Sequence, residues 1–190
     1  MDLQQIFVTI HLFGFALGLG GATIGDIVFI KSLRRNNLSE EVFGFFKTTS
    51  RIIWIGLGLL IISGLSIFTL IYLEQGSLSL LASSRWQTKL ILVAIVTLNG
   101  LFFKLAIFSI LKNLIHQPLS VQNISPIIWK LAISGTISLV SWYSIFILSL
   151  LPRTFRPQIL IIIGVYVFAL ICGAIISKSI LFNLAKKNSH

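Results

Sequence analysis

The sequence predicts an all-α integral membrane protein whose five transmembrane helices form one bundle. Hydrophobic residues make up 56% of the 190 residues and charged residues only 11%, and the mean hydropathy is +0.98. Soluble domains carry about a quarter charged residues, and disordered chains combine low hydrophobicity with high charge. Both classes are therefore excluded, and residues 1–190 are expected to form a single transmembrane domain in contact with the lipid bilayer.

Five continuous apolar runs are each long enough to cross the hydrocarbon core, which takes about 20 helical residues. Closed barrels would need short alternating segments instead, so the runs favour helices. The first run follows no positively charged start and has no small-residue cleavage site, so we expect it to remain as a helix. The predicted helices cover about 3–30, 52–73, 88–111, 127–151 and 158–182.

The segment 31–50 is predicted to be a short amphipathic piece on the cytoplasmic side. Ser39 is a candidate N-cap, and two glutamates follow it in the first turn, where the helix dipole favours them. Val42, Phe43 and Phe46 are expected to face the membrane. Segment 31–50 is therefore expected to be separate from the second transmembrane helix.

The other connections are predicted to be short. Gly76 marks a turn within the outer segment 74–84. Segment 117–126 is a polar inner loop broken by two prolines, and segment 153–157 has room only for a tight outer turn. No repeat, linker or separate soluble domain interrupts this pattern.

The distribution of positive charge predicts that the N-terminus is outside and the C-terminus inside. Cytoplasmic loops carry an excess of lysine and arginine, and the formal net charge is +10. With this orientation, eleven basic residues lie at or near the cytoplasmic side, namely Lys31, Arg34, Arg35, Lys47, Arg51, Lys104, Lys112, Lys130, Lys178, Lys186 and Lys187. Only Arg85, Lys89, Arg153 and Arg156 lie at the other. We therefore expect a multi-pass protein of a bacterial cytoplasmic (inner) membrane, with no nucleic-acid partner.

Three of the four tryptophans lie near the ends of predicted helices, as interfacial anchors do. They are Trp54, Trp86 and Trp129. Trp142 lies deeper and is a candidate for lining an interior site.

His11 lies in the outer half of the first predicted helix, above a strip of glycines. At about 100° per residue, Gly14 and Gly18 share its face, as do Gly21 and Gly25. A flat macrocycle such as heme b or a related porphyrin needs such a face, and the imidazole could ligate its iron. The alternative is that His11 bonds a neighbouring helix and the glycines form a close-packing seam.

The remaining members of this predicted cofactor site are Lys89, Asn99 and Trp142. Lys89 begins the third helix near the level of His11 and suits a propionate, while Asn99 is a polar support deeper in that helix. A second axial ligand is not obvious, because His116 lies at the opposite side and His190 ends the chain. A single-ligand heme, a site shared across a dimer and no heme all stay open.

Asp26 is the only acid at membrane depth, where a centred charge costs about 2.5–3.5 kcal/mol on insertion scales. Lys104 on the third helix and Arg51 at the start of the second reach a similar depth. We expect Asp26 to pair with one of them, which would lower the cost of both charges. Such a pair serves either as a proton or ion relay or as a lock on helix packing.

Residues for other chemistry are sparse. The lone Cys172 excludes an internal disulfide and a thiolate metal cage. No serine lies near a credible base and orienting acid, and no nucleotide-binding or zinc-protease fingerprint occurs. Catalysis is therefore neither indicated nor excluded.

Several short motifs carry a resemblance to known families. Seven of them resemble motifs of a group of small uncharacterised bacterial membrane proteins. They are His11-Leu12-Phe13-Gly14, the Gly20-Gly21-Ala22 stretch to Asp26, Trp54-Ile55-Gly56, Ser63-Gly64, Lys89-Leu90, Asn99-Gly100 and Ser138 to Trp142. More loosely, His11, Trp86 and Lys89 resemble the copper-resistance D proteins and the HemJ-type protoporphyrinogen oxidases, although Gln87 stands where a HemJ protein has histidine. That resemblance implies membrane copper handling or heme and porphyrin redox chemistry.

Two function hypotheses follow. In the first, the protein binds heme or a porphyrin in its outer half, with His11 as the metal ligand. In the second, it is a small transporter or an assembly partner within a membrane complex, and Asp26, Lys104 and Asn99 define an interior polar site. In either role we expect the protein to form a homo-oligomer or to be a partner in a membrane complex.

Overall fold

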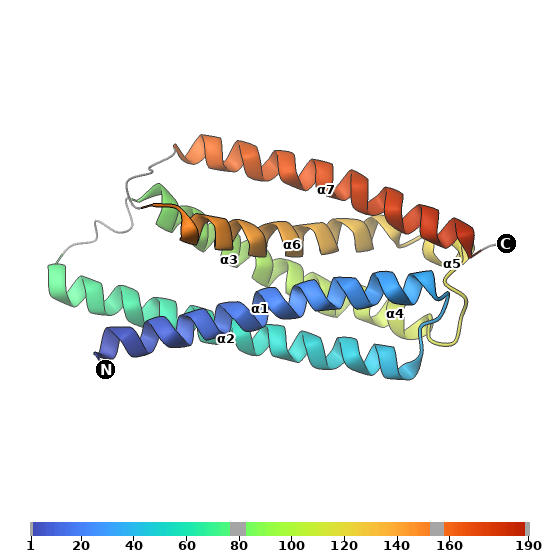
Figure 1. Cartoon of the computed structure of the whole chain (residues 1–190), viewed down its shortest axis with the longest axis horizontal. Helices are drawn as coiled ribbons and strands as arrows, with labels where there is room; N and C mark the ends of the chain where they lie inside the picture. The colour runs from blue at the N-terminus through green and yellow to red at the C-terminus, as the bar shows by residue number, and fades with distance from the viewer. Residues whose placement is uncertain (1, 77–82, 153–157, 189–190) are drawn as a thin grey trace.

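The computed structural model describes residues 2–76, 83–152 and 158–188, which are helical apart from short connections (Figure 1). Five helical stretches are long and apolar enough to cross a membrane, as predicted. They are Leu3–Arg34, Glu40–Glu74, Ser84–Asn113, Ile128–Leu150 and Ile159–Lys187. The protein is therefore an all-α, multi-pass membrane protein.

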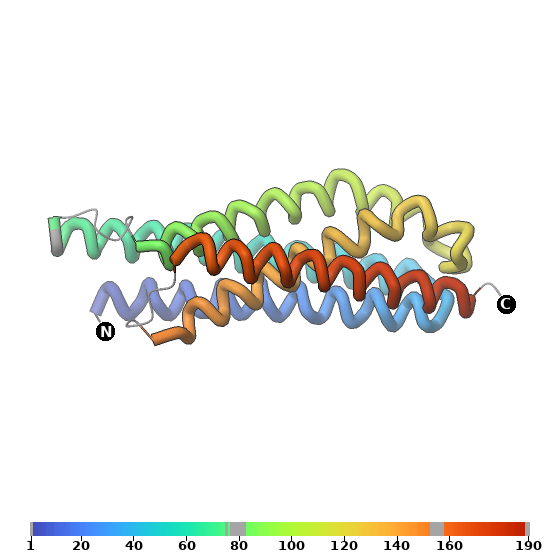
Figure 2. Tube along the Cα trace, turned by 90° about the horizontal axis from the view of Figure 1, so that it is seen from above, coloured from blue at the N-terminus to red at the C-terminus, as the bar shows by residue number. Residues whose placement is uncertain are grey.

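The five stretches run lengthwise beside one another, and the described termini lie at opposite ends (Figures 1 and 2). In chain order the elements are α1 (Leu3–Arg34), α2 (Glu40–Gln75), α3 (Ser84–Phe102), the π-helix η2 (Phe103–Ile107), α4 (Phe108–Asn113), α5 (Val121–Ile124), α6 (Ile128–Leu150) and α7 (Ile159–Lys187). Together α3, η2 and α4 form the third span. An odd number of spans places the two described ends of the chain on opposite sides of a membrane, and the assignment of the N-terminus to the outside stays a prediction.

The two ends of the bundle differ in where basic side chains lie relative to the ends of the helices. At the end where α1 and α7 finish, Lys31, Arg34, Lys186 and Lys187 lie in the last turns, and cations are favourable at helix C-termini. We call this the basic end. At the opposite end, Arg85 donates hydrogen bonds of 2.7–2.9 Å to three carbonyl oxygens where α6 finishes.

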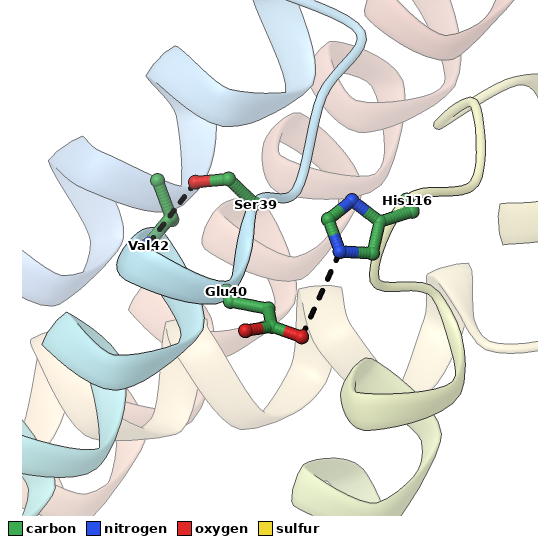
Figure 3. Close-up of polar contacts among 4 residues, drawn as sticks. All are labelled: Ser39, Glu40, Val42 and His116. Atoms are coloured by element: carbon green, nitrogen blue, oxygen red, sulfur yellow. Dashed lines mark hydrogen bonds and ion pairs between the residues drawn. The ribbon is translucent and has the colours of Figure 1, made fainter.

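Segment 31–50 is not a separate amphipathic piece, which corrects the prediction. α1 continues to Arg34, and α2 begins at Glu40 and runs without a break into the second span. Ser39 is the N-cap, as predicted, because its Oγ accepts a hydrogen bond of 3.3 Å from the Val42 amide (Figure 3). With no proline between residues 40 and 52, nothing stops the helix at the membrane surface.

Val42, Phe43 and Phe46 face the protein rather than the membrane, which corrects a second prediction. Phe46 is buried in the core cluster at the basic end, and the other two pack against that cluster. The Phe43 ring lies 5.4 Å from that of Phe108 in an edge-to-face arrangement. These aromatics join α2 to α4 instead of anchoring a surface helix.

The connections follow the sequence more closely. Gly76 ends α2 in the left-handed conformation (φ 59°), as its predicted turn requires. The inner loop 117–126 contains the single turn α5. His116 Nε2 lies 3.7 Å from Glu40 Oε1, and both side chains are exposed (Figure 3). The predicted turn at 153–157 and the terminal His190 lie outside the described residues.

Large apolar side chains cover the outside of the bundle, as contact with lipid requires. Leu98 on α3 is 66% exposed, Leu105 on η2 is 76% exposed, and Leu160 on α7 is 74% exposed. Water would penalise such a surface, whereas lipid tails are as apolar as leucine. The exposed face therefore supports contact with the bilayer.

The helices divide into two groups with unequal packing. Among the described residues, the backbone of α2 packs mainly against that of α1, whereas α6 packs against α3, α7 and α1. Aromatic side chains span the wider gap from α2 to the third span: the Phe68 ring lies 5.1 Å from the Trp86 ring, and Trp54 lies against Gly100. Trp54 is therefore inside the bundle near the middle of α2, not at a helix end as predicted.

Candidate functional site

His11 is held against α2 by a hydrogen bond. Its Nδ1 lies 3.0 Å from the Oγ of Ser63, a residue that is 1% exposed. The Ser63 hydroxyl donates to the Leu59 carbonyl oxygen, so Nδ1 of His11 is the donor in the first bond. The ring also lies over Gly64. Lys89 on α3 is near enough to His11 to act on it electrostatically, so these two predicted site residues are brought together.

The glycines beneath His11 are covered by protein. A Cβ on Gly14 would stand 2.7 Å from the Gly56 carbonyl oxygen, and a Cβ on Gly56 would stand 2.6 Å from that of Gly14. Further along α1, a Cβ on Gly18 would overlap the Trp142 ring, and one on Gly21 would meet Ile53 at 2.6 Å. The backbones of α1 and α2 touch here, which is the geometry of a small-residue packing seam.

These contacts do not fit a porphyrin. The face that the glycine spacing predicts for the macrocycle is filled by the α2 backbone and by Trp142. The other predicted supports do not converge on His11 either: Asn99 is ten residues beyond Lys89, or about 15 Å along the helix at 1.5 Å per residue. We therefore assign His11, Gly14 and Gly18 to helix packing in this structure.

The described residues also lack a metal-binding group. No three histidine, cysteine, aspartate or glutamate side chains in ranges 2–76, 83–152 and 158–188 lie close enough to hold one ion. His116 lies beside Glu40 at the basic end, while His11 lies in the other half of α1. The histidines that the structure describes therefore do not form a ligand pair.

A cavity of about 370 Å³ lies between the helices, nearer the basic end than His11 does. Residues of α1, α2, α3, α6 and α7 line it, together with Phe103 and Leu111 of the third span. Gly25 of α1 lies on its wall, where an added Cβ would meet the Thr49 side chain only at 3.9 Å. All five membrane spans therefore contribute to one internal space.

Asp26 lies on the wall of this cavity and has no partner among the residues that the structure describes. No hydrogen bond or ion pair to its carboxylate is present within ranges 2–76, 83–152 and 158–188. The expected pair with Lys104 or Arg51 does not form, because both basic side chains are exposed on the outside of the bundle. The three residues lie at similar depths along their helices, which is why the sequence predicts a pair. Their side chains are on different faces of the bundle, however, so they do not meet.

Two further polar groups on the cavity wall are left without partners. Asn99 donates a hydrogen bond of 2.9 Å to the backbone carbonyl oxygen of Ser134. The Ser134 hydroxyl itself and Nε1 of Trp142 are buried with no hydrogen-bond partner within the described part of the chain. Native interiors satisfy nearly all buried polar groups, so two exceptions among residues that line the Asp26 cavity mark it as the candidate site.

The sequence indicates only part of this site. Asp26, Asn99 and Trp142 stand out as polar or amphipathic groups at membrane depth. The second function hypothesis places Asn99 with Asp26, as the structure does, whereas Trp142 is grouped only with the porphyrin. Ser134 belongs to a helical row with Ser138 that is equally typical of a packing surface. The signal available is the spacing of these serines, which places both on one face of α6 and, in the structure, on the cavity wall.

Comparison with known proteins assigns no relative: no family model, curated protein or solved structure matches the chain. The resemblance to copper-resistance D and HemJ-type proteins therefore rests on the short motifs alone.

Proposed function

We propose that the protein is a small polytopic membrane transporter whose substrate site is the Asp26 cavity. The observation that carries this proposal is a carboxylate without a partner among the described residues, on the wall of a cavity that all five spans line. An acid in a membrane interior is costly and is a functional-site hypothesis by default. A structural role would bring Asp26 a donor or a cation, as Asn99 has its carbonyl.

The arrangement of the helices supports the same role. The cavity lies where α2 is joined to the third span by side chains rather than by close backbone packing. Transport requires the central site to open to each side in turn, through movement of one helix group against another. The pair α1–α2, locked by its glycine seam, is suited to move as one body against α3, α6 and α7.

Thiol accessibility in membrane vesicles tests the proposal. Ser138 lines the cavity, so Ser138→Cys is introduced into a Cys172→Ser background and exposed to a small, membrane-impermeant thiosulfonate. Right-side-out and inside-out vesicles are labelled separately. The matched control is Leu98→Cys, on the lipid-facing side of α3, where an apolar environment keeps the thiol protonated and unreactive.

A transporter predicts labelling of Ser138→Cys from both sides of the membrane, at least tenfold faster than labelling of Leu98→Cys. Labelling from one side only would reveal a binding site that does not alternate, and would overturn transport. Labelling from neither side would show that water never reaches the cavity, and would overturn the site as well.

The porphyrin hypothesis is tested separately by the absorption spectrum of the purified protein. Because the glycine face of α1 is covered, we expect no Soret band and no stoichiometric iron. A Soret band that disappears on His11→Ala would restore the porphyrin as the principal function and would show that α1 and α2 separate to admit it.

A further inference from the structure

We infer that the substrate of the Asp26 cavity is a small organic cation with an apolar, preferably aromatic, body. This inference rests on the proposed function, because it names the substrate class of that same site. The contact that defines the substrate is between its positive charge and the Asp26 carboxylate, with aromatic rings around the remainder.

The charges on the cavity wall select a cation. Asp26 is the only ionisable side chain among the described residues that line the cavity, and no lysine, arginine or histidine is present there. A carboxylate away from water needs a partner of opposite charge. A neutral substrate would leave the carboxylate uncompensated, and an anion would be repelled by it.

The composition of the wall selects an organic rather than an inorganic cation. Calcium takes six to eight oxygen ligands and magnesium a near-octahedral set, whereas the described residues include no cluster of three acids or histidines. The cavity instead presents Phe29, Trp54, Phe103 and Trp142. Aromatic faces attract ammonium and quaternary ammonium groups, with tryptophan the strongest of them.

The size and the remaining polar groups narrow the class further. A volume of about 370 Å³ lies at the small end of the range for small-molecule sites, about 300–1,000 Å³. Apart from Asp26, the described polar side chains that line the cavity are uncharged, among them Thr49, Asn99 and Ser138. The substrate is therefore expected to be compact, with a single positive charge and few polar atoms.

Binding of benzyltrimethylammonium to the purified protein in zwitterionic nanodiscs tests the inference by isothermal titration calorimetry. Benzyl alcohol and benzoate are the neutral and anionic comparisons. The formal net charge of +10 repels cations non-specifically, so a preference for the cation has to come from a local site. We expect benzyltrimethylammonium to bind at least tenfold more tightly than either comparison.

Two substitutions locate the binding. Asp26→Asn keeps the size of the side chain and removes its charge, and we expect it to weaken cation binding at least tenfold. Glu41→Gln is the matched control, because Glu41 is an exposed acid at the start of α2, and it should leave affinity unchanged. Should Asp26→Asn fail to fold, Trp54→Leu provides the second test, with an expected loss of about fivefold from the missing aromatic face.

The outcomes separate the inference from the proposed function. Equal affinity for the cation and benzoate, or cation affinity unchanged in both Asp26→Asn and Trp54→Leu, would overturn the cationic substrate. The thiol-labelling pattern of Ser138→Cys would then still support transport of another substrate class. Loss of two-sided labelling, with cation binding intact, would overturn transport and leave a cation-binding membrane protein.

Discussion

Two regions along α1 are built on opposite principles. Around Gly14, the backbones of α1 and α2 are in contact, and the nearby His11 side chain has a hydrogen-bond partner. Twelve residues later, about 18 Å along the helix, Asp26 faces an internal space with no partner among the described residues. Close packing and satisfied polar groups make the first region a joint between α1 and α2, whereas the open space and the unsatisfied groups make the second region the candidate site.

The difference shows how one helix in lipid serves both purposes. Helices in a bilayer gain nothing from apolar burial itself, so close approach and interhelical hydrogen bonds have to hold them together. The glycine seam provides both and keeps α2 on α1. The cavity can then remain unfilled, since the joint and the core cluster at the basic end carry the packing on either side of it.

The sharpest way to break the joint is Gly56→Ala. The added Cβ would stand 2.6 Å from the Gly14 carbonyl oxygen and 2.9 Å from the Gly18 amide nitrogen, so two backbones must separate. We expect a loss of about 3 kcal/mol in the free energy of unfolding, at the upper end of the usual cost of overpacking. Thermal unfolding in detergent measures it.

Gly58→Ala is the control for that experiment, because nothing lies within 4 Å of its Cβ position. The control should be neutral, or stabilising by up to about 1 kcal/mol from helix propensity. Equal losses in both variants would show that α1 and α2 are not in backbone contact.

At the candidate site, Asp26→Leu should stabilise the protein while abolishing the proposed transport. Removing an unpartnered acid from the bilayer interior recovers about 2 kcal/mol of the cost on insertion scales, and stability gained at a functional residue is commonly paired with lost activity. Unfolding by denaturant in mixed micelles measures the change. Asn99→Leu is the contrast: it removes the bond to Ser134 and should lose about 1 kcal/mol. A destabilised Asp26→Leu would reveal a partner for the carboxylate.

Gly18 and Trp142 lie where the joint meets the site, and their substitutions should be coupled. Gly18→Ala drives a Cβ into the Trp142 ring, and Trp142→Phe makes room for it. We expect the double variant to lose about 1 kcal/mol less free energy of unfolding than the two single variants lose together, within the usual range for residues in contact. A thermodynamic cycle from thermal unfolding measures this, and strict additivity would place the ring elsewhere.

The smallest effect is expected from Ser63→Ala, which removes the hydrogen bond to His11. Hydrogen bonds between membrane helices average about 0.6 kcal/mol, so the loss should be of that order. Ser66→Ala is the matched control, since the Ser66 hydroxyl bonds to the Ile62 carbonyl of its own helix. Identical stabilities for the two variants would show that the His11 bond adds nothing to the joint.

The sequence by itself determined the features that depend on neighbouring residues. Each of the five spans follows from a continuous apolar run, the start of α2 from Ser39, and its end from the left-handed Gly76. The start of the second span is the exception, because the amphipathic stretch before it continues the same helix. These features are local, so hydropathy, capping and turn chemistry are sufficient to predict them.

The tertiary structure alone decided which helix faces meet. It set Gly14 against Gly56, laid Trp142 over Gly18, and placed Asp26 on the cavity wall while Lys104 and Arg51 point outward. Depth in the membrane can be read from position along a helix, but rotation and pairing depend on contacts between residues far apart in the chain. For that reason the acid was visible in the sequence, while the lack of a partner among the described residues and the space beside it were not.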